Sequence, residues 1–186
     1  MRLFFAINLP DAVRRQLAEV QEALRGRVPE KVSWVRPQQL HITLKFLGEC
    51  EEQQLKRIES HLSTRLFPPP LDIEIPSLML IPPRGRTRVI AAEVREPTGG
   101  LTCMYRTLDD IGAKAGIPAE PERFLPHVTL GRLRPPRRVR QSELDEYASD
   151  LWESLKFKAD KVELIHSTLS SSGPSYKILR IVTLPV

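Results

Sequence analysis

The sequence predicts an α+β fold with antiparallel sheets. Segments typical of helices and of strands mix along the chain without the strict strand–helix–strand rhythm of a parallel sheet. The 186 residues include 17 prolines, roughly twice the usual ~5%, and these divide the chain into short elements. No long linker separates two parts, and the length suits one mid-sized unit. We therefore expect a single domain over residues 1–186.

The first 70 residues predict three strands and two helices. The strands are expected over 3–7, 32–35 and 41–47, and the helices over 11–25 and 51–66. The first strand is a continuous apolar run, and the third alternates between apolar and polar residues. Apolar residues at helical spacing begin at Val13 in the first helix, and Gly26 is its expected stop. The second helix has two acids in its first turn and one apolar face, and the prolines at 68–70 end it.

A similar series of elements follows the prolines. It comprises strands over 71–75, 78–81, 89–94 and 127–133 and a helix over 98–115. Arg84-Gly85-Arg86 is expected to form a turn, and Gly116 to stop the helix. The remaining elements are a basic Pro/Arg loop over 134–140, a helix over 142–155 and a hairpin of strands over 157–169 and 176–184. The hairpin would turn at Ser171-Ser172-Gly173-Pro174.

The composition excludes several classes of protein. With 41% hydrophobic and 27% charged residues, the chain is typical of a globular protein and not of a disordered one. Its two cysteines, Cys50 and Cys103, form no C-x-x-C pair, which excludes a disulfide scaffold and a structural zinc site. No apolar run approaches the ~20 residues of a membrane span, and the N-terminal run is too short for a signal peptide. We expect a soluble, cytoplasmic monomer with reduced cysteines.

One tetrapeptide pattern occurs twice. His41-Ile42-Thr43-Leu44 and His127-Val128-Thr129-Leu130 share the pattern His-aliphatic-Thr-Leu, and they lie about half a chain apart. Each copy falls in an expected strand, where residues i and i+2 share a face. The histidine and the threonine of each copy would therefore face one way, and the two aliphatic residues would face the core. A single copy would be ordinary on a solvated sheet face, but two copies predict a common cleft.

Paired imidazoles suit displacement at phosphorus. The attacking and leaving oxygens lie on opposite sides of the phosphate, so one group must accept a proton and another must donate one. Imidazole can do both because its unperturbed pKa, ~6.5, is close to neutrality. The threonine hydroxyls could donate hydrogen bonds to the non-bridging oxygens. A metal site on His41 and His127 is disfavoured because neither motif has a carboxylate at ligand spacing.

At this point the chain resembles a known family, the two-histidine (2H) phosphoesterases. The resemblance is specifically to the bacterial and archaeal RNA 2′,3′-cyclic phosphodiesterases, once called 2′-5′ RNA ligases. The segments that carry it are residues 2–10 (RLFFAINLP), 40–49 (LHITLKFLGE) and 124–132 (FLPHVTLGR), together with Ser167-Thr168-Leu169, Gly173 and Tyr176 near the C-terminus. It spans nearly the whole chain.

The resemblance implies a fold, a reaction and a set of roles. The fold would be bilobal and pseudo-two-fold, with two intertwined lobes, two antiparallel sheets facing a central cleft, and helices outside. The reaction would open the 2′,3′-cyclic phosphate end of an RNA to a 2′-phosphate, without metal or cofactor. His41 would be the proton donor and His127 the proton acceptor, while Thr43 and Thr129 would hold the phosphate. Arg132 matches a position that is often basic and would also bind substrate, although strict alternation places it on the face opposite His127 unless the strand ends or twists there.

Strand period also makes predictions for the neighbours of the first motif. Lys45 shares the face of His41 and is expected near the cleft, whereas Phe46 is expected in the core. Four further aromatic side chains could stack on a nucleobase, but core packing is the expected role of each: Phe5, Trp34, Phe124 and Tyr176.

The positive charge is concentrated in two stretches. The chain has 28 Lys+Arg and 23 Asp+Glu, a net charge of +5. Nine arginines lie in two segments without acids: Arg84, Arg86 and Arg88 in one, and Arg123, Arg132, Arg134, Arg137, Arg138 and Arg140 in the other. Because the guanidinium fork suits phosphate, we predict that these arginines flank the cleft and hold the RNA backbone. The alternative is a solubilising loop.

Three alternatives to the main prediction stay open at this point. The same site could act on small cyclic nucleotides or on 2′-5′ linkages. It could also run in reverse as a 2′-5′ RNA ligase. A non-catalytic RNA-binding module would need only the charge.

Overall fold

The structure, a computed structural model, describes residues 1–28, 31–119, 124–149, 154–170 and 173–185. Four α-helices, one 3-10 helix and ten strands are formed by these residues, and the predicted α+β class is confirmed. The strands are β1 (Arg2–Asn8), β2 (Val32–Trp34), β3 (His41–Glu49), β4 (Leu71–Ile75), β5 (Leu78–Ile81), β6 (Thr87–Glu93), β7 (His127–Arg137), β8 (Leu155–Ala159), β9 (Lys161–Ser170) and β10 (Gly173–Thr183). The helices are α1 (Asp11–Arg25), η1 (Pro37–Gln39), α2 (Glu52–Leu62), α3 (Gly100–Lys114) and α4 (Gln141–Ala148).

Eight of the strands form one antiparallel sheet in two halves. The order is β10-β9-β1-β3-β7-β6-β5, with β2 also paired to β7, while β4 and β8 form a separate two-stranded sheet. Strands β3 and β7 are paired at one position only, Ile42 with Val128. The sheet therefore divides between its two motif strands. We call β10, β9, β1 and β3 the β3 half, and β2, β7, β6 and β5 the β7 half.

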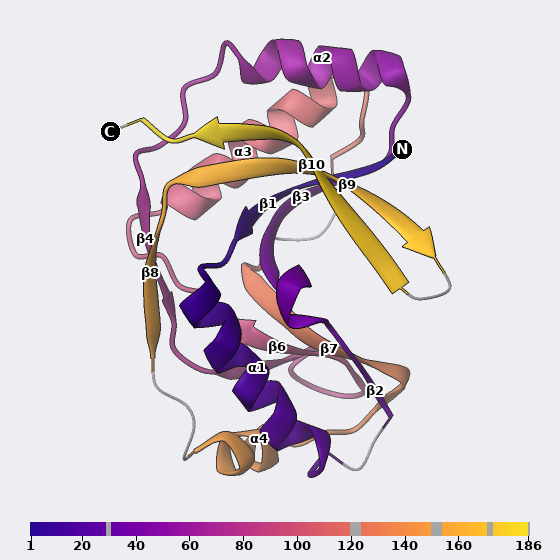
Figure 1. Ribbon diagram of the computed structural model, residues 1–186, viewed down its shortest axis with the longest axis vertical. Coiled ribbons are helices and arrows are strands. Elements are labelled where there is room, and N and C mark those ends of the chain that lie inside the picture. Colours follow the sequence, from indigo (N-terminus) through magenta and orange to yellow (C-terminus); the bar gives the residue numbers. More distant parts are fainter. Residues whose placement is uncertain (29–30, 120–123, 150–153, 171–172, 186) are drawn as a thin grey trace.

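The two longest helices, α1 and α3, each pack against the half of the sheet that does not contain the strand before them. Helix α3 follows β6 but packs against β3. Helix α1 follows β1, yet its Gln21 side chain donates to the Leu130 carbonyl of β7 at 2.8 Å. In Figure 1, α2 and α3 lie beside the β3 half, and α1 and α4 beside the β7 half. These crossings connect the two halves although their strands barely pair.

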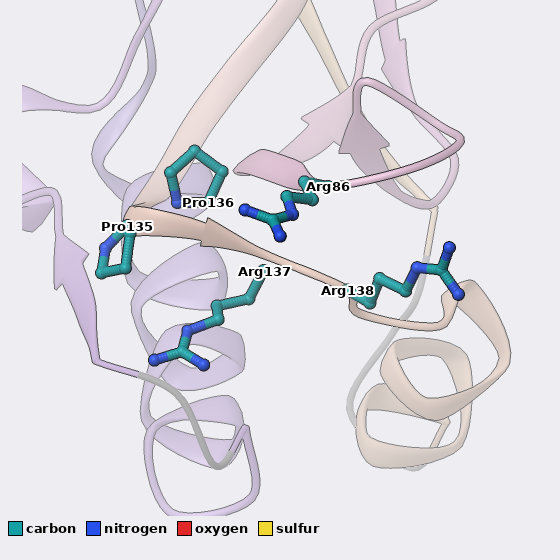
Figure 2. Close-up of a pocket in the computed structure, with 5 residues that line it drawn as sticks. All are labelled: Arg86, Pro135, Pro136, Arg137 and Arg138. Carbon is teal, nitrogen blue, oxygen red and sulfur yellow. The ribbon is translucent and has the colours of Figure 1, made fainter.

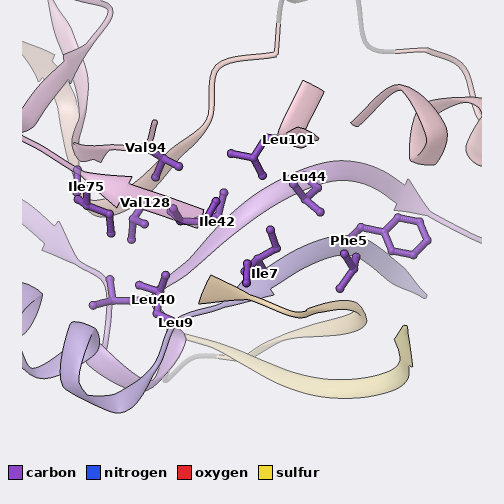
Figure 3. Close-up of a cluster of buried hydrophobic side chains, with 14 of the residues drawn as sticks. Phe5, Ile7, Leu9, Leu40, Ile42, Leu44, Ile75, Val94, Leu101 and Val128 are labelled. Atoms are coloured by element: carbon purple, nitrogen blue, oxygen red, sulfur yellow. The ribbon is translucent and has the colours of Figure 1, made fainter. Parts of the chain in front are cut away.

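The core lies on the side of the motif strands that faces these helices. Ile42, Leu44 and Val128 are buried there with apolar residues of β1, as Figure 3 shows. Both faces of β1 are covered, and Phe4 and Ala6 form a smaller cluster with Ile165 on the opposite side. This double burial explains why residues 3–7 are a continuous apolar run.

The structure corrects three expected boundaries. Strand β7 continues to Arg137, so the expected loop over 134–140 is wrong for its first half. Helix α4 ends at Ala148, and Leu155 already belongs to β8; residues 150–153 lie outside the described residues. The expected strand over 157–169 is two strands, β8 and β9, which separate at Asp160 and lie in different sheets. The expected hairpin turn at 171–172 also lies outside the described residues.

None of the described helices has the length and apolarity needed to cross a membrane.

Candidate active site

The two motifs meet at the single pair that joins the halves of the sheet. Ile42 and Val128 are antiparallel partners, and both side chains lie in the core. The residue before and the residue after each of them therefore point to the opposite face of the sheet. The same register sets His41 beside Thr129 and Thr43 beside His127. Two imidazoles and two hydroxyls are thus arranged about one pseudo-two-fold axis, as the repeated pattern predicts.

A bulge in β3 changes the face on which the next side chains lie. Phe5 pairs with Lys45 and Ala6 with Thr43, so β3 contains one extra residue, Leu44. As a result Leu44 and Lys45 are both buried, and Phe46 points outward. The prediction that Lys45 lies at the cleft is therefore wrong. Only 1% of its side chain is exposed, and its Nζ lies 2.8 Å from Oδ1 of Asp109 on α3.

The prediction of a core position for Phe46 is wrong for the same reason. The bulge turns its ring to the cleft, where 46% of it is exposed.

A bulge at the equivalent position of β7 brings Arg132 onto the face of the second motif. Ile90 pairs with Gly131 and Ala91 with Thr129, so one extra residue, Leu130, is again accommodated. Leu130 and Gly131 are buried, and Arg132 faces the cleft beyond Thr129. Strict alternation, which placed Arg132 on the opposite face, does not survive the bulge.

The face that carries the motifs forms the wall of a cleft of about 640 Å³. Its lining residues come from both halves of the sheet: Arg2, Phe4, Ser33, Trp34, Val35, Gln39, His41, Thr43, Phe46, Thr129, Arg132, Arg134, Ser167, Leu169, Pro174 and Tyr176. Three of them are arginines, and none of the described carboxylates lines the cleft; His127 lies beside Thr43 but is not among the lining residues. The cleft thus combines a strong positive charge with several aromatic rings. Arg2 and Gln39 were not among the candidates from sequence.

Both imidazoles are held in the same tautomer. His41 Nδ1 donates to the Gln39 carbonyl at 2.7 Å, and His127 Nδ1 donates to the Leu125 carbonyl at 2.8 Å. Since a carbonyl oxygen can only accept, each Nδ1 carries a hydrogen and each Nε2 is left to exchange a proton. In the neutral ring, His41 Nε2 accepts from the Thr43 hydroxyl at 3.1 Å.

The surroundings lower the pKa of both imidazoles. Burial is the main cause of the lowered pKa of His41, with further contributions from the charges of His127, Arg132 and Arg14. Burial also lowers the pKa of His127, and Arg132 adds to the effect. In each case the hydrogen bond to the backbone carbonyl acts in the opposite direction. Both rings therefore favour the neutral form at pH 7, and an anion in the cleft would favour the cationic form.

Aromatic rings pack around His41, whereas none of the described rings is in contact with His127. The Phe4 ring centroid lies 5.0 Å and the Tyr176 centroid 5.6 Å from that of His41. Tyr176, expected in the core, is 37% exposed and lines the cleft. Trp34 packs against the core, as expected, and also lines the cleft. The predictions for the other two aromatic candidates are confirmed, because Phe5 is buried in the core and Phe124 packs flat on Tyr105, with ring centroids 4.6 Å apart.

Gln39 connects His41 to the β9–β10 hairpin. Its carbonyl accepts from the imidazole, and its side-chain amide donates to the Pro174 carbonyl. Pro174 and Tyr176 of β10 line the same cleft. The sequence does not reveal this link, because η1, which contains Gln39, is only three residues long and has no periodic pattern.

The arginines of the two basic stretches occupy different places. Arg132 and Arg134 line the cleft, and Arg86, Arg137 and Arg138 surround a separate hollow of about 470 Å³ (Figure 2). Arg140 is in an ion pair with Glu143. Arg84 and Arg88 are exposed. Arg123 lies outside the described residues.

Within the described part of the chain, no three His, Cys, Asp or Glu side chains form a group that could hold a metal ion.

This arrangement has the groups needed for acid–base chemistry on a phosphate. Two Nε2 atoms on opposite sides of one axis can accept and donate a proton. Two threonine hydroxyls and the Arg132 guanidinium can bind the non-bridging oxygens between them.

Comparisons with known proteins agree with this geometry. A family model described as LigT like Phosphoesterase matches residues 7–91 and 93–176. The chain is 30% identical to the RNA 2′,3′-cyclic phosphodiesterase of Methanocaldococcus jannaschii, over 97% of this chain and 99% of that protein. It is 32% identical to the protein of the same name from Archaeoglobus fulgidus, again over 97% and 99% of the two chains.

Solved structures show the same fold. A crystal structure of a Thermus thermophilus protein covers 99% of this chain and 98% of its own, with 28% identity and a TM-score of 0.80. The structure of Escherichia coli LigT complexed with 3′-AMP covers 98% and 97%, with 26% identity and a TM-score of 0.75.

Proposed function

Since the chain belongs to the family of LigT-like phosphoesterases, we propose that it hydrolyses the 2′,3′-cyclic phosphate end of RNA to a 2′-phosphate. The observation that carries this proposal is the pair of His-x-Thr motifs that meet at one strand pair beside the cleft, which His41, Thr43 and Thr129 line. The names of its relatives supply the substrate class, because the curated proteins cited above are RNA 2′,3′-cyclic phosphodiesterases.

In the proposed reaction the two histidines act on opposite sides of the phosphate. His127 Nε2 takes a proton from water while the water oxygen bonds to phosphorus. The bond from phosphorus to the 3′ oxygen breaks, and protonated His41 donates its Nε2 proton to that oxygen. The product has a 2′-phosphate and a free 3′-hydroxyl. One proton has moved from His41 to the product and one from water to His127, so the two histidines end in exchanged protonation states.

The phosphate itself helps to charge the donor. A cyclic phosphate carries one negative charge, and its approach raises the pKa of the neutral imidazoles. Once His41 is protonated, its Nε2 can no longer accept from the Thr43 hydroxyl. The Thr43 hydroxyl hydrogen then turns to a phosphate oxygen, and the Nε2–H of His41 is directed to the 3′ oxygen. The Thr129 hydroxyl donates to a phosphate oxygen from the other half, and Arg132 compensates the charge that builds up on the non-bridging oxygens.

The first experiment identifies the product. An RNA oligomer that ends in a 2′,3′-cyclic phosphate is incubated with the protein in chelator, and the product is analysed by mass and by its resistance to a 3′-specific phosphatase. A 2′-phosphate formed at an undiminished rate in chelator is the expected result and supports a reaction without metal. A 3′-phosphate, or no product with or without added divalent metal, contradicts the proposal.

A second experiment tests the roles of the two histidines, which are assigned by motif order. A substrate with sulfur in place of the bridging 3′ oxygen has a leaving group that needs little protonation. We expect it to restore turnover to His41→Ala and not to His127→Ala. Rescue of His127→Ala alone would exchange the two roles.

A further inference from the structure

The charge of the cleft exceeds what the reacting group requires. A 2′,3′-cyclic phosphate carries one negative charge, and Arg132 lies nearest to the two motifs along β7. Yet Arg2 and Arg134 also line the cleft, and none of the described carboxylates does. Among the described residues, none of these three guanidinium groups forms an ion pair with an acid. Like charges brought this close cost free energy unless an anion joins them, so the cleft favours a ligand with more than one phosphate.

The excess charge continues along β7 and out of the cleft. Arg134 at the cleft edge is followed directly by Pro135 and Pro136, which line the hollow together with Arg86, Arg137 and Arg138. Arg138 lies six residues beyond Arg132, just after the end of β7. Six residues of extended chain reach about 20 Å, which is the scale of a short segment of RNA backbone.

The hollow has the character of a polyanion site. Figure 2 shows its arginine side chains spread around the strand, with Arg86 on the side of Pro136 and Arg138 toward the far end. Arg86 and Arg138 are exposed, and no described acid forms an ion pair with either of them. Arginines without acidic partners keep their full charge for a ligand, in contrast to Arg140, which is paired with Glu143.

We propose that Arg134, Arg86 and Arg138 form a track that binds the phosphates preceding the terminal nucleotide of the RNA. The preferred substrate is then an oligomer, and mononucleotide 2′,3′-cyclic phosphates are poor substrates. This inference rests on the proposed function for the position of the reacting end, while the track itself depends only on the arrangement of the arginines. The RNA backbone would leave the two motifs along the β7 half of the sheet. The aromatic rings near His41 lie on the β3 half.

The test compares substrate length with and without the outer part of the track. The kcat/KM is measured for 2′,3′-cyclic AMP and for oligoadenylates of two, four and eight nucleotides with a cyclic end. The variant Arg86→Ala/Arg138→Ala is compared with the parent and with Arg15→Ala/Arg57→Ala. This control removes two exposed arginines from α1 and α2 and has the same net charge. Binding of an octamer with a 3′-phosphate is measured in parallel at several salt concentrations.

We expect the parent to turn over the octamer more efficiently than the mononucleotide. The track variant should lose about threefold in octamer kcat/KM for each arginine, and about tenfold in total, while mononucleotide turnover is kept. Its slope of log affinity against log salt for the octamer should be shallower by about 1.4, since each neutralised phosphate contributes about 0.7. The control variant should behave as the parent.

Two results would overturn the track. One is an efficiency that does not depend on substrate length in the parent. The other is a track variant that keeps the length dependence and the salt slope of the control. Failure of the proposed function would look different, because no cyclic phosphate of any length would then be turned over. The binding measurement would still decide for or against the track in that case.

Discussion

The two motif strands follow the same backbone course but place different side chains at equivalent positions. In both, a bulge one residue beyond the threonine buries two consecutive residues and turns the third toward the cleft. In β3 the two buried residues are Leu44 and Lys45, and the third is Phe46. In β7 the two buried residues are Leu130 and Gly131, and the third is Arg132. Each half therefore supplies a histidine and a threonine, while one adds an aromatic ring and the other a cation.

The second buried residue of each bulge, Lys45 in β3 and Gly131 in β7, packs against a different element. Lys45 extends to α3 and is paired there with Asp109. At Gly131 there is no room for a side chain, because a Cβ would lie 2.5 Å from Val32 Cγ1 on β2. The same local backbone is thus held by an ion pair in one half and by close strand packing in the other. The two halves share the bulged backbone that places the motif side chains. They differ at the buried position of the bulge, where Lys45 fits the contact with α3 and Gly131 fits the contact with β2.

The largest expected effect tests the equivalence of the two histidines. His41→Ala and His127→Ala should each lower kcat on a cyclic-phosphate oligomer by roughly 10²–10⁴-fold, because each removes one proton transfer. The double variant should lose less than the product of the two effects, since the groups act as a unit. Steady-state kinetics with circular dichroism as a folding control decides the matter. A variant that retains parental kcat with a native spectrum would refute the shared role.

The next effect concerns the ion pair of the β3 half. Asp109→Leu should lower the free energy of unfolding by about 3–5 kcal/mol, because it leaves the buried Lys45 cation without a partner. Lys45→Met should cost less, since the Asp109 side chain is 26% exposed and can reach water. The double variant should recover most of the loss. Urea denaturation gives all three values, and equal losses for the two single variants would show that burial does not set the cost.

A smaller effect is expected at the equivalent position of the β7 half. Gly131→Ala should cost about 1–3 kcal/mol, because the new methyl group overlaps β2. Gly112→Ala on α3 is the matched control, since the nearest atom to its Cβ is at 3.4 Å. A helical alanine there should be neutral or stabilising. If both variants unfolded at the same urea concentration, close packing against β2 would not explain the glycine.

The smallest effect is a shift in titration. The pKa values of His41 and His127 should both lie below 6.5, and Arg132→Gln should raise both because it removes a nearby cation. The limbs of the pH profile of kcat/KM, which reports the free enzyme, should then move to higher pH in the variant. NMR titration of the two rings checks the direction. A shift of only one ring would mean that Arg132 acts on one half of the site alone.

These lowered pKa values also have a consequence for stability. The unfolded chain binds protons at its histidines at a higher pH than the folded chain does, so folding stability should decrease as the pH falls through 6.5. Replacing both motif histidines by Gln should reduce this dependence, as measured by urea denaturation between pH 5 and 8.

The sequence by itself determined the α+β class, most of the elements and the two motifs. It could do so because burial on one face of a strand imposes alternation, and because a repeated pattern signals a repeated environment. For the same reason Ile42 and Val128 could be placed in the core without a structure.

Only the tertiary structure decided what happens after each threonine. Period-two reasoning fails at a bulge, since one extra residue exchanges the faces of all that follow, and so Lys45, Phe46 and Arg132 were assigned to the wrong side. A bulge depends on the register with a neighbouring strand far away in the sequence, so the motif residues alone do not reveal it. Likewise the role of Gln39 and the position of Arg86 beside Pro135, Pro136 and Arg138 arise only when distant segments meet. The local sequence pattern determines which residues lie on the same face of a strand. The pairing with neighbouring strands determines where a bulge interrupts this alternation.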